Sequence, residues 1–182
     1  MSKINALCVY CGSSPGTDPA FVETARSFGK ILAENNIRLV YGGGSTGLMG
    51  AVAEAVLKNG GDVTGIIPEF LTNRERPRRL AQELIVTRDM HERKAKMFER
   101  ADGFVALPGG IGTLEELFEA WTGGYLGVHD KPVVMLDPIG HFDELRAWLN
   151  GLLDSGYVSQ FALDRLVVVD EVRAAMAACA PS

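Results

Sequence analysis

The sequence predicts an α/β fold, a doubly wound, Rossmann-like parallel sheet flanked by helices. Short apolar runs rich in β-branched residues alternate with segments of helical period along the chain. Several runs, such as Val133–Leu136, are apolar without interruption, which suits strands buried on both faces. The connections are long enough for helical crossovers, and these make neighbouring strands parallel and the connections right-handed.

The apolar runs define the expected strands, which are Ala6–Tyr10, Arg38–Tyr41, Val63–Ile67, Leu84–Val86, Phe104–Leu107, Val133–Leu136 and Leu166–Val169. The segments of helical period define the expected helices, at about 18–35, 47–59, 89–100, 113–126, 143–154 and 170–178. Two helix starts carry a capping-box pattern, Asp89 with Glu92 and Thr113 with Glu116.

Residues 68–83 lie between two predicted strands and hold two prolines and alternating charges, so we expect a mobile loop there. The basic cluster of the chain falls in this segment and comprises Arg74, Arg76, Arg78 and Arg79. A solvated loop is the favoured interpretation of the cluster, and a ligand clamp is the alternative.

Composition excludes several classes of protein. With 182 residues, 47% hydrophobic and 23% charged, we expect one domain over residues 1–182. A formal charge of -5 argues against binding to a nucleic-acid backbone. No signal peptide or membrane-spanning run is recognisable, so we expect a cytoplasmic protein without membrane partners.

Cys8, Cys11 and Cys179 are too few for a disulfide framework, and Cys8 is expected to be a buried thiol, not half of a redox pair.

Three glycine-bearing turns follow predicted strands, at 11–14, 42–47 and 108–113. The carboxyl ends of parallel strands share one edge of a sheet, so we expect these turns to line one ligand-binding crevice. The turn at 108–113 also opens a helix, where backbone N–H groups and the positive end of the helix dipole favour a phosphate. The alternative is that the glycines only permit tight turns.

The turn at 42–47 also fits the G-x-G-x-x-G dinucleotide fingerprint, and Glu69 lies about where an acidic residue would hold a ribose. An NAD-dependent oxidoreductase is therefore a rival interpretation. Against it, one dinucleotide site leaves the 108–113 unit unexplained, and a chain of 182 residues leaves no room for a substrate domain.

One face of the predicted helix 89–100 mixes apolar and cationic residues at helical spacing, namely Met90, Arg93, Lys94 and Met97. In one interpretation the methionines pack while Arg93 and Lys94 extend their charges to solvent. In the other, both cations face the crevice and engage a nucleotide.

Two acidic residues, Glu115 and Glu116, follow the 108–113 turn. As neighbours on a helix they point about 100° apart, so we expect them to have separate roles. Glu116 fits a capping box, but a carboxylate one turn from a bound phosphate is also within reach of the sugar. His91, His129 and His141 lack the spacing of a zinc helix, so no metal site is expected, and we predict no cofactor either.

Taken together, the segments Cys11–Ser14, Gly42–Gly50, Met90–Lys94 and Pro108–Glu116 resemble the Lonely Guy family, and the match runs from about residue 4 to 169. Members are cytokinin riboside 5′-monophosphate phosphoribohydrolases, long described as lysine decarboxylases, with a Rossmann-like fold and usually a homodimer. The resemblance implies cleavage of the N-glycosidic bond of adenosine-type 5′-monophosphates to a free base and ribose 5-phosphate. A molybdenum-cofactor or nucleotide carrier is a non-catalytic alternative, and the preferred base stays open.

By this resemblance Arg93 and Glu116 match the catalytic residues of the family. Ile111 stands where many members have Tyr, and residues 122–125 replace a more usual T-W-A-Q. The turns, the helix face and the resemblance together give the expected substrate-binding residues, which are Ser13, Gly43, Gly44, Glu75, Met90, Lys94, Gly109, Gly110, Ile111, Gly112, Thr113, Leu114, Glu115 and Thr122.

Overall fold

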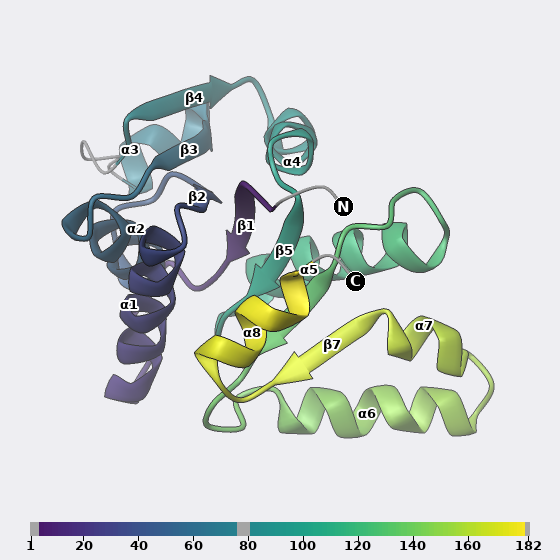
Figure 1. The fold of residues 1–182 in the computed structure, drawn as a ribbon. Helices are drawn as coiled ribbons and strands as arrows, with labels where there is room; N and C mark the ends of the chain where they lie inside the picture. Colours follow the sequence, from purple (N-terminus) through teal and green to yellow (C-terminus); the bar gives the residue numbers. More distant parts are fainter. Residues whose placement is uncertain (1–3, 76–80, 181–182) are drawn as a thin grey trace.

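The computed structural model describes residues 4–75 and 81–180, without the side chains of Arg74 and Glu75. A parallel sheet with the strand order β4-β3-β2-β1-β5-β6-β7 forms its centre (Figure 1). The strands are β1 (Ala6–Tyr10), β2 (Arg38–Tyr41), β3 (Val63–Pro68), β4 (Glu83–Thr87), β5 (Gly103–Ala106), β6 (Val133–Leu136) and β7 (Leu166–Val169). Every adjacent pair is parallel, which confirms the predicted doubly wound fold.

Helices connect the strands and cover the sheet (Figure 1). They are α1 (Pro19–Glu34), α2 (Gly47–Lys58), α3 (Thr72–Glu75), α4 (Met90–Glu99), α5 (Ile111–Tyr125), α6 (Asp143–Asp154), α7 (Gln160–Asp164) and α8 (Val172–Cys179). Each of the predicted helices is present, with its ends shifted by at most two residues.

Two short segments differ from the prediction. Residues Glu69–Leu71 form a 3₁₀ turn that continues into α3, where a loop was expected, and the Thr72 hydroxyl donates to the Glu69 carbonyl at 2.7 Å. Residues 76–80, with Arg76, Arg78 and Arg79, lie outside the described residues, and Arg74 is described by its backbone alone. Helix α7 was not predicted because its five residues are too few to display a period, although the Ser159 hydroxyl accepts the Ala162 N–H at its start.

The two faces of the sheet carry separate cores because side chains alternate along each strand. Leu7 and Val9 of β1 pack with α1, α2 and α8, whereas Cys8 and Tyr10 pack with α4, α5 and α6. Strands β1, β2, β3, β5 and β6 are almost entirely buried, which agrees with their uninterrupted apolar sequences. Cys8, Cys11 and Cys179 are free, buried thiols, as expected of structural cysteines.

The direction in which the chain winds reverses at β1. After β1 the chain builds β2, β3 and β4 on one side, and then crosses back to place β5 on the other side of β1. The loops that leave β1 and β5 therefore diverge over the carboxyl edge of the sheet, and a crevice between them is the usual ligand site of such folds. No helix in the described part of the chain is both long and apolar enough to cross a lipid bilayer.

Candidate active site

The three glycine turns meet at the carboxyl edge of the sheet, as predicted. The Gly12 N–H donates to the Pro108 carbonyl at 3.1 Å, which ties the first turn to the third. The Leu48 N–H donates to the Gly12 carbonyl at 3.0 Å, and the Thr46 hydroxyl donates to the Ser13 carbonyl at 3.0 Å. The second turn is thereby fastened to the first.

A cleft of about 220 Å³ opens between these turns. The predicted site residues that line it are Ser13, Met90, Arg93, Gly110, Ile111, Gly112, Thr113, Glu115 and Glu116. Cys11, Gly12 and Gly42 also line it, as expected of the first two glycine turns, together with Val9 and Met49, which were not among the expected binding residues. Val9 lies near the end of β1 and Met49 in the first turn of α2, so their place beside a glycine turn was the signal that could have found them.

Several expected residues lie elsewhere. Gly43 has φ of +79° and is buried against the backbone of β3, and neither it nor the buried Gly44 lines the cleft. Thr122 follows Ile111 by eleven positions on α5, or about 16 Å along the helix. The same cleft lining does not include Lys94, Gly109 or Leu114, and the Glu75 side chain lies outside the described residues.

Arg93 is buried, with a side-chain exposure of 7%, which excludes the interpretation in which it extends its charge to solvent. Its Nε donates to the Ile66 carbonyl at 3.2 Å, and Nη2 donates to the Gly42 carbonyl at 3.1 Å. Ile66 lies in β3 and Gly42 directly follows β2, so the two carbonyls hold the guanidinium near the carboxyl edge of the sheet. The remaining nitrogen, Nη1, lies 3.7 Å from the sulfur of Met90, which lines the cleft.

Gly42 is the residue that admits this arginine. A Cβ atom at position 42 would lie 1.9 Å from Arg93 Nη2, far inside van der Waals contact. Gly42 is therefore needed because it lets the Arg93 side chain approach the backbone closely, and not only because it permits a turn.

Glu116 lies beside Arg93 in the cleft. Its Oε1 lies 3.8 Å from Arg93 Nη1, and its side-chain exposure is 10%. The predicted capping box of Thr113 and Glu116 is wrong, because α5 begins at Ile111 with Gly110 as its N-cap. Glu116 thus lies in the second turn of the helix, where its side chain points into the cleft instead of back to the helix start. The other predicted box is present, since the Asp89 carboxylate accepts the Glu92 N–H at 2.8 Å.

The N-terminus of α5 supplies the anion-binding element. Its N-cap, Gly110, has no side chain to accept the first N–H groups, and residues 110–113 line the cleft. Thr113 is buried against Gly109, whose Cβ, if present, would lie 2.0 Å from the Thr113 hydroxyl oxygen. Backbone N–H groups and the helix dipole therefore meet in a cleft with an arginine and a carboxylate.

Lys94 does not line the cleft and instead pairs with two carboxylates of α5. Its Nζ bonds to Glu115, which is on the cleft wall, and lies 2.8 Å from Glu119 Oε2. Partial burial lowers the pKa of the Lys94 ammonium, but the hydrogen bonds to Glu115 and Glu119 outweigh it and leave the pKa above its ordinary value. Glu115 and Glu116 thus have different cationic partners, as their directions on the helix predicted.

Cys11 adds a neutral thiol to the cleft. Burial raises the pKa of this thiol strongly, and the nearby negative charge of Glu116 raises it further. At neutral pH the thiol keeps its proton, so Cys11 contributes shape, not nucleophilicity. Within residues 4–75 and 81–180, no three His, Cys, Asp or Glu side chains are grouped as metal ligands.

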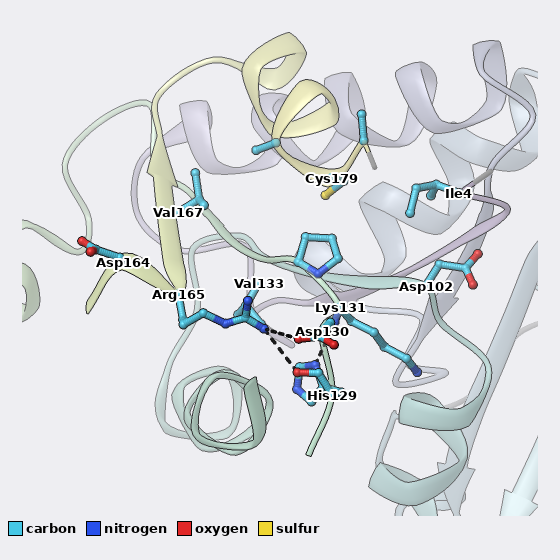
Figure 2. A pocket seen from close by; sticks show the side chains of 13 residues that line it. Ile4, Asp102, His129, Asp130, Lys131, Val133, Asp164, Arg165, Val167 and Cys179 are labelled. Carbon is cyan, nitrogen blue, oxygen red and sulfur yellow. Dashed lines mark hydrogen bonds and ion pairs between the residues drawn. The ribbon is translucent and has the colours of Figure 1, made fainter. Parts of the chain in front are cut away.

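A larger cavity, of about 760 Å³, lies at the opposite edge of the sheet. It is lined by residues at the amino ends of β1, β5, β6 and β7, and Figure 2 shows its charged side chains. Arg165 bonds there to the His129 carbonyl at 3.2 Å and lies 3.6 Å from Asp130. None of the predicted site residues lines this cavity, so the smaller cleft is the candidate active site.

A family described as possible lysine decarboxylase matches residues 49–179. The chain is 57% identical, over 97% of its length and 94% of the relative, to the cytokinin riboside 5′-monophosphate phosphoribohydrolase of Mycobacterium tuberculosis. It is 46% identical, over 88% of its length and 74% of the relative, to a protein of the same name from Arabidopsis thaliana.

Solved structures with the same fold are more distant in sequence. The molybdenum cofactor binding protein of Rippkaea orientalis has a TM-score of 0.71 at 22% identity, with 97% of this chain and 95% of that chain covered. The molybdenum cofactor carrier protein of Chlamydomonas reinhardtii has a TM-score of 0.70 at 24% identity, with 96% and 94% covered. At such identities the likeness concerns the fold and not the ligand.

Proposed function

Because this chain belongs to the family of the cytokinin riboside 5′-monophosphate phosphoribohydrolases, we propose that it hydrolyses the N-glycosidic bond of adenosine-type 5′-monophosphates, N6-substituted ones included. The products are the free base and ribose 5-phosphate. Beyond family membership, the proposal rests on the buried pair of Arg93 and Glu116. This pair lines the same cleft as the N-terminus of α5.

The 5′-phosphate is assigned to the start of α5. The N–H groups of residues 110–113 and the positive end of the helix dipole favour an anion there. Glu116 follows Ile111 by five residues, which is about 7.5 Å along the axis and comparable with the span from the phosphate to the glycosidic carbon of a nucleotide. A phosphate at the helix start therefore brings the scissile bond near the Glu116 carboxylate.

In the proposed reaction the bond between the ribose C1′ and the base nitrogen breaks, and its electron pair leaves with the base. Positive charge develops on the ribosyl ring, where the Glu116 carboxylate stabilises it. A water molecule oriented by the same carboxylate adds its oxygen to C1′. The water gives up one proton in the process, and the departing base takes up a proton.

Arg93 has a different role in this proposal. Its two hydrogen bonds to backbone carbonyls fix the guanidinium, so that Nη1 faces the cleft at little entropic cost. From there it stabilises negative charge on the departing base and pairs with the Glu116 carboxylate. Glu115, on the cleft wall and held by Lys94, is assigned to the ribose hydroxyls. The proposed chemistry needs neither a metal nor a cofactor.

Two rival activities fit the site less well. A lysine decarboxylase with pyridoxal phosphate needs a lysine that can lose its proton and form a Schiff base. Lys94, at the edge of this site, is instead held as an ammonium by Glu115 and Glu119. A dinucleotide site needs an acidic residue at the ribose, and Glu69 is exposed and does not line the cleft.

The homodimer expected from the family also remains a proposal. On α5, Trp121 is buried and donates its indole N–H to the Ala162 carbonyl at 2.6 Å. Tyr125, Leu126 and Val128 are exposed, and form a short apolar surface at the end of α5. We assign the dimer contact to this surface.

The proposed activity is tested by incubating the protein with AMP, N6-isopentenyl-AMP and the corresponding nucleosides, with chromatographic detection of the free base. The 5′-monophosphates should be cleaved and the nucleosides should be nearly inert, because binding energy at the phosphate is used at the reacting bond. Equal turnover of adenosine and AMP would exclude the role given to the α5 N-terminus, and release of no base from any monophosphate would exclude the function.

A further inference from the structure

His141 contacts the predicted phosphate loop from outside the cleft. It follows β6, and its ring Nε2 lies 2.9 Å from the carbonyl oxygen of Gly109. A carbonyl oxygen can only accept a hydrogen bond, so Nε2 carries a proton and donates it to Gly109. The sequence analysis considered His141 only as a metal ligand, and its spacing argued against that role.

The histidine is itself held in place by a buried carboxylate. Asp137 accepts the backbone N–H groups of His141 and Phe142, at 2.8 and 2.7 Å, through its two oxygens. The imidazole ring then packs edge-on against Phe142 and against Phe21 of α1, with centroid distances of 4.7 and 5.3 Å. These contacts fix the ring before any ligand binds.

The loop at Gly109 and Gly110 separates the cleft from a second hollow of about 250 Å³. His141, Phe21 and Gly109 line the hollow and not the cleft, whereas Gly110 lines both. The Gly109–Gly110 peptide is trans and planar, so its C=O and N–H groups point in opposite directions. Because the C=O points at His141 in the hollow, the Gly110 N–H points away from it, toward the cleft side of the loop.

We propose that His141 is a positioning residue that keeps the Gly110 N–H directed at the substrate phosphate. A peptide between two glycines rotates easily, because neither residue has a Cβ to restrict it. A rotated peptide would present its carbonyl oxygen to the phosphate and repel it. The His141 hydrogen bond prevents this rotation, so the anion site is formed before the substrate arrives. This inference rests on the proposed function for the identity of the anion.

The test compares His141→Ala, His141→Gln and Phe21→Leu with the wild type. His141→Ala removes the donor, whereas His141→Gln can donate its amide N–H to the same carbonyl. Phe21→Leu is the matched control, since it removes a ring contact of His141 and leaves the hydrogen bond. Steady-state kinetics with AMP give KM and kcat, and calorimetry in a Glu116→Gln background gives AMP affinity with turnover strongly reduced.

We expect His141→Ala to raise the KM for AMP about tenfold with a smaller change in kcat, the effect of losing one hydrogen bond that orients a phosphate ligand. His141→Gln should lie within about threefold of the wild type, and Phe21→Leu within about twofold. Unchanged AMP affinity in His141→Ala overturns the proposal. So does equal weakening by all three variants, which would assign the effect to packing.

The calorimetric arm separates this inference from the proposed function. If the wild type cleaves no monophosphate, the proposed function fails, and AMP affinity still decides the role of His141. If AMP is cleaved and His141→Ala binds it normally, only the role of His141 fails. Absence of AMP binding in the Glu116→Gln background with intact His141 overturns both.

Discussion

Arg93 and Glu116 form an ion pair of 3.8 Å with almost no exposure to solvent, and they reach it from different helices, α4 and α5. Burying two charges costs more free energy than a single ion pair at this distance returns. The pair is stabilised further by the two carbonyl groups that Arg93 contacts. An arrangement that costs stability at the base of a cleft is typical of a functional site.

The first prediction concerns the charge of Glu116. Glu116→Gln should lower kcat for AMP about a hundredfold or more, the magnitude typical for loss of one electrostatic group in a dry site. The fold should persist because Arg93 keeps its two carbonyl contacts. Steady-state kinetics and thermal unfolding check this, with Glu119→Gln, an exposed residue of the same helix, as the control that keeps near-normal turnover. Near-normal turnover in Glu116→Gln would move the catalytic assignment to Glu115.

A second prediction concerns stability. Arg93→Ala removes one member of a buried ion pair and should lower the free energy of unfolding by about 3–5 kcal/mol. The double variant Arg93→Ala with Glu116→Gln should recover part of this loss, because the buried carboxylate charge has been removed. Urea unfolding of the four proteins of this cycle measures the coupling. If the two substitutions change the free energy of unfolding by amounts that simply add, the ion pair contributes nothing to stability.

The third prediction uses a glycine. Gly42→Ala places a Cβ where Arg93 Nη2 now lies, so the guanidinium must move and activity should fall about a hundredfold. Gly151→Ala is the matched control, since its Cβ would meet no atom within 4 Å and lies within α6. The control should keep full activity and be more stable by about 0.5–1 kcal/mol. Normal activity in Gly42→Ala would mean that Arg93 does not act from its observed position.

A fourth prediction concerns the thiols. Burial raises the pKa of Cys179 to about 12, and it raises the pKa values of Cys8 and Cys11 well above their ordinary value. Because the reactive species is the thiolate, the native protein at pH 8 should react very slowly with Ellman's reagent. In guanidinium chloride all 3 cysteines should react at once. A rapidly reacting thiol in the native protein would contradict the burial of these residues.

The fifth prediction concerns the oligomer. Light scattering at micromolar concentration should give twice the chain mass of 19.6 kDa. Leu126→Glu should shift the mass toward that of the monomer, because it places a charge on the apolar surface formed by Tyr125, Leu126 and Val128. A wild-type protein of monomer mass would exclude the dimer, and a dimer that survives Leu126→Glu would place the contact elsewhere.

Most of the architecture could be predicted from the sequence because it depends on local periodicity. Val133–Leu136 was expected as a buried strand and has these bounds, and the helix expected at 143–154 is Asp143–Asp154. The failures are short or depend on context. Helix α3 and helix α7 have four and five residues, and such lengths show no period that could be read from the chain.

The sequence by itself determined which residue types gather at the carboxyl edge, because strand ends and glycine turns are local features. Only the tertiary structure decided what each side chain does there. The helical spacing of Arg93 and Lys94 fits a solvated cation and a buried cation equally well. Packing against β2 and β3 buried Arg93, whereas Lys94 paired with a carboxylate of α5. The pattern of Thr113 and Glu116 fitted a cap, but α5 began two residues earlier and turned Glu116 toward Arg93. Such directions depend on contacts between segments far apart in the chain, and no local pattern contains them.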